Sequence, residues 1–190
     1  MLRRFDNIGL PDSWIVAGCI AQTVWNLAYG RSAEFGIKDV DLVYFDSADL
    51  SAKAETDHEE RLCRYFKNLP VKLDVKNEAR VHLWYERAFG YPIPAYRSTA
   101  DAIASFPTTA TAIGVRRAAG KFECCAPFGL DDLFTLTVRP NKRQITPAIY
   151  AAKVTPWRSA WPNLTFLGWD DADCRSAAST MALRRSRKSP

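Results

Sequence analysis

Two aspartates separated by one apolar residue form the pattern in this chain that most directly suggests chemistry. Asp39 and Asp41 open an Asp-Val-Asp-Leu-Val-Tyr run, whose β-branched and aromatic residues predict a strand over 39–46. Alternate residues of a strand leave the same face, so both carboxylates should lie side by side. Such close negative charges repel each other unless a cation intervenes. Hard oxygen ligands of this kind favour magnesium or manganese, and magnesium also binds substrate phosphates.

Asp74 is a third carboxylate that could join Asp39 and Asp41 in one site. It lies in 71–75, where apolar and polar residues alternate as in a strand. If the two strands are neighbours, Asp39, Asp41 and Asp74 would hold two metal ions that neutralise a triphosphate and activate an attacking hydroxyl. The alternatives are a solvated turn or strand edge for the pair, and a surface salt bridge to a neighbouring lysine for Asp74.

A glycine turn before the aspartates suggests a place for phosphate. The apolar run 14–17 predicts a strand that ends at Gly18, and the composition of 19–29 predicts a helix that ends at Gly30. The first backbone amides of such a helix and the positive end of its dipole cradle phosphate. Lys38 could also contact phosphate, although a strand neighbour of the aspartates more often points to the opposite face.

The remaining segments predict one α/β domain. The first half reads strand, helix, strand, helix, strand, which indicates a mixed sheet with flanking helices. A hairpin is expected from 109–116 and 121–125, followed by a helical and extended C-terminal part. Further helices are expected over 49–69, 79–89, 98–105, 131–138 and 147–154, and an extended segment from there to 169.

Length and charge set the domain organisation. The chain has 190 residues, which is long enough to bury one core. Its net charge is +5. Four positive charges lie near the C-terminus, at Arg184, Arg185, Arg187 and Lys188. We therefore expect one folded domain over 1–169 and a basic, disordered tail over 170–190. Any contact with nucleic acid is expected through this tail alone.

The cysteines and apolar runs indicate the compartment. The five cysteines lack Cys-x-x-Cys spacing and are accompanied by only two histidines, so no zinc site is predicted. The chain has neither the apolar run of a signal peptide nor that of a transmembrane helix, and no membrane partner is expected. Free thiols without an export signal indicate the cytoplasm.

The order of glycine turn, helix, paired aspartates and third carboxylate resembles the nucleotidyltransferase superfamily that includes the palm of DNA polymerase beta. The resemblance spans about residues 10–165, and the chain looks like one bacterial branch of the superfamily that has no settled substrate. The stretches that carry it are 17–26, 36–46, 75–85 and 126–134.

This resemblance implies a palm-like fold, with Asp39, Asp41 and Asp74 as metal ligands and Gly18 as the phosphate turn. Cys19 departs from the pattern, which has serine or a second glycine at that position. A thiol donates poorly to phosphate, so Cys19 would contribute its backbone amide to the cradle. A thiol activated by the helix dipole and a small buried packing residue are the two other interpretations of Cys19.

Several other residues have two interpretations. Gln22 and Asn26 could read a base or sugar, or make polar contacts between helices. His82 could be a general base or a packed histidine. The basic loop 139–143 could receive an anionic substrate or be a solvated turn. The late aromatic residues, between 157 and 169, could stack on a base or close the core.

The sequence thus predicts a magnesium- or manganese-dependent transferase that moves a nucleoside monophosphate from a nucleoside triphosphate to an unidentified hydroxyl acceptor, releasing pyrophosphate. Cys19 motivates a second hypothesis, a nucleotide-binding module or partner domain that keeps the pocket without turnover. The basic tail motivates a third, a nucleic-acid-associated protein with strongly salt-dependent binding.

Overall fold

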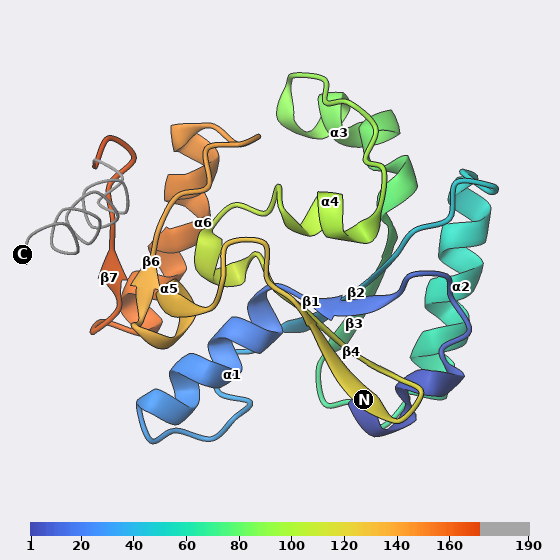
Figure 1. Ribbon diagram of the computed structural model, residues 1–190, viewed down its shortest axis with the longest axis horizontal. Coiled ribbons are helices and arrows are strands. Elements are labelled where there is room, and N and C mark those ends of the chain that lie inside the picture. The colour runs from blue at the N-terminus through green and yellow to red at the C-terminus, as the bar shows by residue number, and fades with distance from the viewer. Residues whose placement is uncertain (172–190) are drawn as a thin grey trace, which may run out of the picture.

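A five-stranded mixed sheet lies at the centre of the computed structural model (Figure 1), which describes residues 1–171. The strand order is β3-β2-β1-β4-β5. β2 and β3 are parallel, whereas the other neighbours are antiparallel. The strands are β1 (Trp14–Val16), β2 (Asp39–Tyr44), β3 (Lys72–Asn77), β4 (Gly114–Ala118) and β5 (Lys121–Cys125). The predicted mixed α/β architecture is confirmed.

Helices flank this sheet, and a small second sheet lies near the end of the described chain. The α-helices are α1 (Gly18–Ala28), α2 (Ala52–Tyr65), α3 (His82–Phe89), α4 (Thr99–Ile103), α5 (Asp131–Phe134) and α6 (Pro147–Ala160). Short 3-10 helices are η1 (Leu2–Asn7), η2 (Glu78–Arg80) and η3 (Thr109–Thr111). The small sheet pairs β6 (Thr137–Val138) with β7 (Thr165–Phe166) in parallel. Within residues 1–171, every helix is too short or too polar to cross a membrane.

Alternation along β2 and β3 separates an apolar face from the face that carries the carboxylates. One face of the sheet packs on α2 and η1. The buried residues of this contact include Leu42, Tyr44, Leu73 and Val75 from the sheet, Leu62 from α2 and Phe5 from η1. Val43 belongs to the other face, where it packs with Val16 and Ile103. Because side chains alternate, Asp39 and Asp41 share the face of Val43. The apolar residue between the aspartates faces the other way, as predicted.

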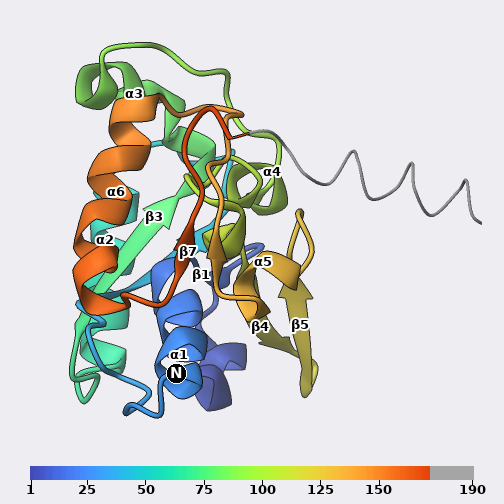
Figure 2. The ribbon, with the colours of Figure 1, turned by 90° about the vertical axis from the view of Figure 1, so that its left-hand side faces the viewer.

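A second core lies between α1 and α6, whose ends are side by side in Figure 2. The Trp25 ring of α1 makes edge contacts with Trp157 and Trp161, at centroid distances of 5.3 and 5.5 Å. Both late tryptophans are buried, so their role here is core closure. The expectation of an extended chain directly after Val154 was wrong, because α6 continues through Pro156 to Ala160. Burial of the two tryptophans stabilises this part of the helix and offsets the free-energy cost of the backbone hydrogen bond that Pro156 cannot donate.

Other predicted elements differ in their bounds. The hairpin is confirmed, but its first strand begins at Gly114, since residues 109–111 form η3 under a cap in which the Thr108 hydroxyl accepts from the Thr111 amide at 3.3 Å. α5 ends at Phe134, two residues before Leu136 adopts a φ of 58°. The expected helix over 79–89 is divided into η2 and α3. α2 is shorter than its expected 49–69. Most of the basic tail, residues 172–190, lies outside the described residues.

Candidate functional site

The parallel register of β2 and β3 brings two of the predicted carboxylates together. Asp41 lies directly opposite Asp74. Both residues line one open cavity of about 200 Å³, together with Gly18, Lys76, Glu78 and Lys153. The cavity therefore gathers residues from the turn before α1, from both strands and from α6, although the sequence separates them widely.

The turn between β1 and α1 forms one wall of this cavity. Ala17 has φ 60° and ψ −125°, a conformation that side chains disfavour, and its amide donates to the Ile113 carbonyl at 3.0 Å. α1 begins at Gly18, and the Ile20 amide already donates to the Ala17 carbonyl at 3.2 Å, so the amides of Gly18 and Cys19 are those that the first turn offers to a ligand. These amides and the helix dipole make the turn a suitable place for a phosphate group.

The carboxylates in and beside the cavity repel one another. Burial, together with the negative charges of Asp39 and Asp74, raises the pKa of Asp41 to about 6, while Lys153 and Lys76 act in the opposite direction. Lys76 Nζ lies 2.9 Å from Asp74 Oδ1 and neutralises that carboxylate. A cation bound between the strands would relieve the repulsion that Asp41 experiences.

The donor set fits a hard divalent cation in its chemistry, because every candidate ligand is a carboxylate oxygen. The side chains do not yet converge: among residues 1–171, no three His, Cys, Asp or Glu residues are close enough together to hold a metal ion. Asp74 is instead paired with Lys76, which engages one oxygen of the third carboxylate. Metal binding would require Asp74 to exchange Lys76 for the ion.

Glu78 is a buried carboxyl group in the lining of the cavity. Its exposed fraction is 6%, and among residues 1–171 burial and neighbouring charges, with no hydrogen bond, act on its carboxyl group. Burial, with the nearby carboxylates of Asp41 and Glu55, raises the pKa of Glu78 to about 8. The group is therefore largely protonated at neutral pH.

Asn77 fixes the backbone that carries Glu78. Its side-chain amide donates to the carbonyls of Asp46 and Asp49 at 2.8 and 3.2 Å, while its oxygen accepts from the amides of Asp46 and Ala79 at 3.0 and 3.1 Å. Its own backbone amide donates to Glu55 at 2.8 Å. A fully bonded, buried asparagine thus holds the end of β3 against the end of β2.

Three residues predicted for the site lie outside the cavity lining. Asp39 is exposed at the first position of β2, and Lys38 is exposed immediately before it. The Cys19 thiol is buried and donates to the Val16 carbonyl at 3.5 Å. Burial and the Asp41 charge raise the pKa of this thiol to about 12, so Cys19 is not an activated thiolate. It packs in the core beneath the sheet.

Two cavity residues were missed by the sequence reasoning. Lys153 is an exposed residue of α6, and nothing in the local sequence separates it from other solvated helix lysines. Glu78 follows the third strand, where an acidic residue ordinarily begins a helix. Of these two residues, only Glu78 could have been found from the sequence. It lies four residues after Asp74, a separation short enough to place both residues at the same end of the sheet.

Residues with two interpretations mostly prove structural. Asn26 is fully buried, donates to the carbonyls of Ala33 and Phe35 at 3.0 and 2.7 Å, and accepts from the Trp161 indole at 2.8 Å. It fixes the loop that leads to β2. His82 lines none of the described cavities, and its buried Nδ1 atom lacks a hydrogen-bond partner within residues 1–171.

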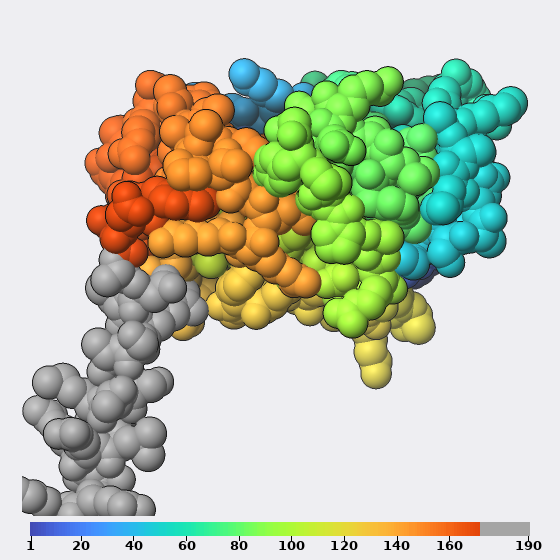
Figure 3. Space-filling view, turned by 90° about the horizontal axis from the view of Figure 1, so that it is seen from above, coloured from blue at the N-terminus to red at the C-terminus, as the bar shows by residue number. Residues whose placement is uncertain are grey.

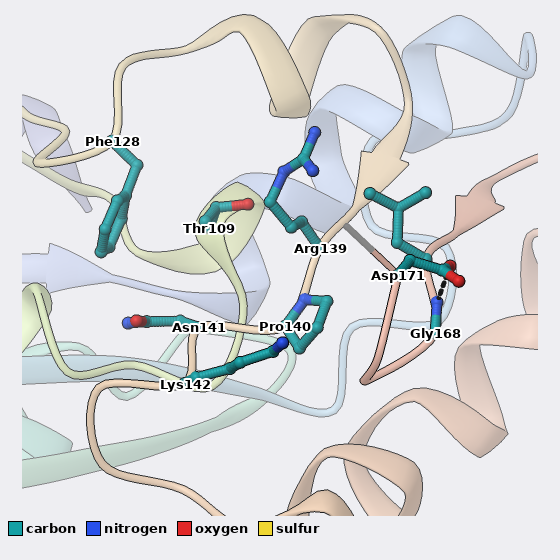
Figure 4. A pocket seen from close by; sticks show the side chains of 9 residues that line it. Thr109, Phe128, Arg139, Pro140, Asn141, Lys142, Gly168 and Asp171 are labelled. Carbon is teal, nitrogen blue, oxygen red and sulfur yellow. Dashed lines mark hydrogen bonds between the residues drawn. The ribbon is translucent and has the colours of Figure 1, made fainter. Parts of the chain in front are cut away.

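The basic loop 139–143 borders a separate cavity of about 330 Å³, which shares no residue with that of the aspartates (Figure 4). Arg139 is paired with Asp132 at 3.0 Å, and Arg143 is paired with Asp101 at 2.6 Å. Asn141 holds the loop to the carbonyls of Ala104 and Phe106. These bonds make the loop part of the framework.

Comparisons with known proteins decide the family. A family described as nucleotidyltransferase matches residues 3–166. The chain belongs to this nucleotidyltransferase family. No curated protein matches it. A solved structure is similar to it, an NMR structure described as revealing a CCA-adding enzyme head domain, with 26% sequence identity and a TM-score of 0.73. The similarity covers 88% of this chain and 87% of the other. As a nucleotidyltransferase by family and by fold, the chain is suited to nucleotidyl transfer in general.

Proposed function

We propose that this nucleotidyltransferase moves a nucleoside monophosphate from a nucleoside triphosphate to a hydroxyl acceptor, with magnesium or manganese held by Asp39, Asp41 and Asp74. The observation that carries the proposal is the position of Asp41 opposite Asp74 in a cavity that also receives Gly18. A phosphate cradle and two carboxylates in one cavity are the parts that phosphoryl chemistry needs.

Each part has a role in the proposed reaction. The first amides of α1 and the Lys153 ammonium bind the outer phosphates, because they supply positive charge beside the cavity. Asp39, Asp41 and Asp74 would hold the ion, which would supply charge neutralisation along the triphosphate. The acceptor oxygen bonds to the α-phosphorus, the bridging bond to the β-phosphate breaks, and pyrophosphate leaves. The hydroxyl proton passes to Asp74.

The test is a thermal-shift panel of four ribonucleoside triphosphates, each with and without magnesium or manganese. A ligand at 100 times its dissociation constant stabilises by about 2.7 kcal/mol. We expect at least one triphosphate to stabilise the wild type only with metal, and Asp39→Asn/Asp41→Asn to lose the response. Asp6→Asn/Asp57→Asn is the matched control, because it removes the same charge away from the cavity.

A metal-dependent response that survives in Asp39→Asn/Asp41→Asn would refute the assignment of the ligands. Pyrophosphate release over a panel of hydroxyl compounds then separates a transferase from a nucleotide-binding module, which binds the triphosphate without releasing pyrophosphate. A nucleic-acid acceptor is one member of that panel, chosen because the similar solved structure is described as a CCA-adding enzyme head domain.

A further inference from the structure

A second cavity, of about 280 Å³, adjoins the first on the side of β3. The two share Asp74, Lys76, Glu78, Phe106 and Pro107, but only the first contains Gly18, Asp41 and Lys153. α3 and the chain that enters α6 enclose the second cavity, and Figure 3 shows these two regions side by side on one face of the molecule. A molecule in it would reach the reacting centre past Asp74.

Aromatic rings form the outer wall of this cavity, and their hydroxyl groups are already bonded. Tyr85 lies 4.4 Å from Phe89 between ring centroids, and its hydroxyl bonds to that of Tyr91 at 3.2 Å. The Tyr96 hydroxyl donates to Gln144 Oε1 at 2.9 Å and bonds to Ser105 at 2.7 Å. The wall is therefore held rigid and presents ring surface to a ligand.

The inner end of the cavity has one polar group without a partner. Glu78 is more than nine-tenths buried, lines both cavities, and makes no side-chain hydrogen bond within the described residues. The single cation in the lining, Lys76, is already paired with Asp74. A ligand here can meet a carboxyl group and aromatic rings, whereas a phosphate or carboxylate would find no free cation.

We propose that this second cavity binds the acceptor, and that the acceptor is a small neutral or cationic ring compound whose hydroxyl or amino group bonds to Glu78. This inference rests on the proposed transfer, because it assigns the triphosphate to the first cavity. In-line displacement requires the acceptor to approach from the side opposite the leaving pyrophosphate. The pyrophosphate lies toward Gly18 and Lys153, so the opposite side is that of Asp74 and the aromatic wall.

The test uses three probes that share a phenol ring and differ in the end group: tyrosol with a hydroxyl, tyramine with an ammonium and para-hydroxyphenylacetate with a carboxylate. Binding to the full chain is measured by saturation-transfer NMR, with and without a non-hydrolysable nucleoside triphosphate and magnesium. We expect tyrosol and tyramine to bind in both conditions and the carboxylate to bind least. Tighter binding of the carboxylate would overturn the proposal, as would the absence of binding by any probe.

Three variants locate the binding. Phe89→Ala should weaken tyramine binding about fivefold, the effect of one lost aromatic contact. Glu78→Leu should weaken the binding of both tyrosol and tyramine, because it keeps the approximate shape of the side chain and removes the group that bonds to their hydroxyl or amino end. Leu83→Ala is the matched control: Leu83 is an exposed residue of α3 outside the cavity lining, and its loss should change nothing. Equal effects of Phe89→Ala and Leu83→Ala would count against the assignment.

Failure here is distinguishable from failure of the proposed function. If the nucleotide displaces the probes, the aromatic cavity holds the nucleoside, and the acceptor assignment is wrong while the transfer stands. If the probes bind but no triphosphate binds with metal, the proposed transfer is wrong, and the second cavity is a binding site without an acceptor role. Simultaneous occupancy of both cavities, sensitive to Phe89→Ala, is the result that supports the inference.

Discussion

Asp41 and Asp74 lie opposite each other across β2 and β3, the parallel strand pair of the five-stranded sheet. In the sequence, a complete helix and two loops separate these two aspartates. Their pairing sets the charge of the cavity, because the Asp41 carboxylate is partly buried beside a second carboxylate. Lys76 compensates Asp74 and leaves Asp41 without an equally close cation. The predictions below test this arrangement and the framework that holds it.

Removal of the Lys76 ammonium should increase metal affinity. In Lys76→Met, Asp74 no longer exchanges an ion pair for the metal, and such partly exposed pairs contribute up to about 1 kcal/mol, or about fivefold in affinity. Manganese binding without nucleotide, followed by electron paramagnetic resonance, measures the effect. Lys67→Met, at an exposed lysine that is not part of the cavity lining, is the control for the charge change. Weaker manganese binding in Lys76→Met would contradict the prediction.

The buried Glu78 carboxyl should make the folded state less stable as pH rises. Its pKa is raised from 4.5 to about 8 in the folded state, so the folded chain binds a proton that the unfolded chain releases between these values. The stabilisation is complete below about pH 4.5 and is lost as the pH rises to about 8, by on the order of 5 kcal/mol.

The measurement for Glu78 is urea unfolding across this pH range, with Glu78→Gln beside the wild type. The glutamine cannot ionise, so the variant should gain stability relative to the wild type as the pH rises. Asp41 acts in the same direction at lower pH, because its pKa is raised to about 6. A stability difference between Glu78→Gln and wild type that is independent of pH would show that Glu78 does not titrate in this way.

The strained turn before α1 should tolerate glycine better than alanine. Ala17 has a φ of 60°, a conformation that costs a non-glycine residue about 1–3 kcal/mol, while glycine adds an entropy cost of about 0.5–1 kcal/mol. Ala17→Gly should therefore stabilise the fold by about 1 kcal/mol. Ala151→Gly, at an exposed position of α6, should instead destabilise it by about 1 kcal/mol. Thermal unfolding of both variants provides the comparison.

Asn26 should be essential to the loop that delivers Asp39 to the sheet. Asn26→Ala removes three buried hydrogen bonds, to Ala33, Phe35 and Trp161, and leaves their partners unsatisfied. A loss of about 3 kcal/mol is expected in urea unfolding. Asn68→Ala, an exposed asparagine after α2, should change stability by less than about 0.5 kcal/mol. Hydrogen exchange should accelerate first in residues 31–38 if Asn26 anchors this loop.

The sequence by itself determined the local elements and the type of chemistry. Alternation in β2 put Asp39 and Asp41 on one face, and the glycine turn placed Gly18 at the start of α1. These features depend on neighbours within a few residues, which is why composition and spacing predict them. The mixed α/β fold class followed from the order of the elements.

Only the tertiary structure decided which distant residues meet. Lys153 enters the cavity because α6 packs on α1 through Trp157 and Trp25. The sequence of neither helix by itself specifies that the two helices pack together. Glu78 is buried because Asn77 binds the end of β2. The aromatic wall exists because Tyr96 reaches Gln144 across 48 residues of sequence. Side-chain packing between remote segments determines these contacts, and a local pattern carries no information about it.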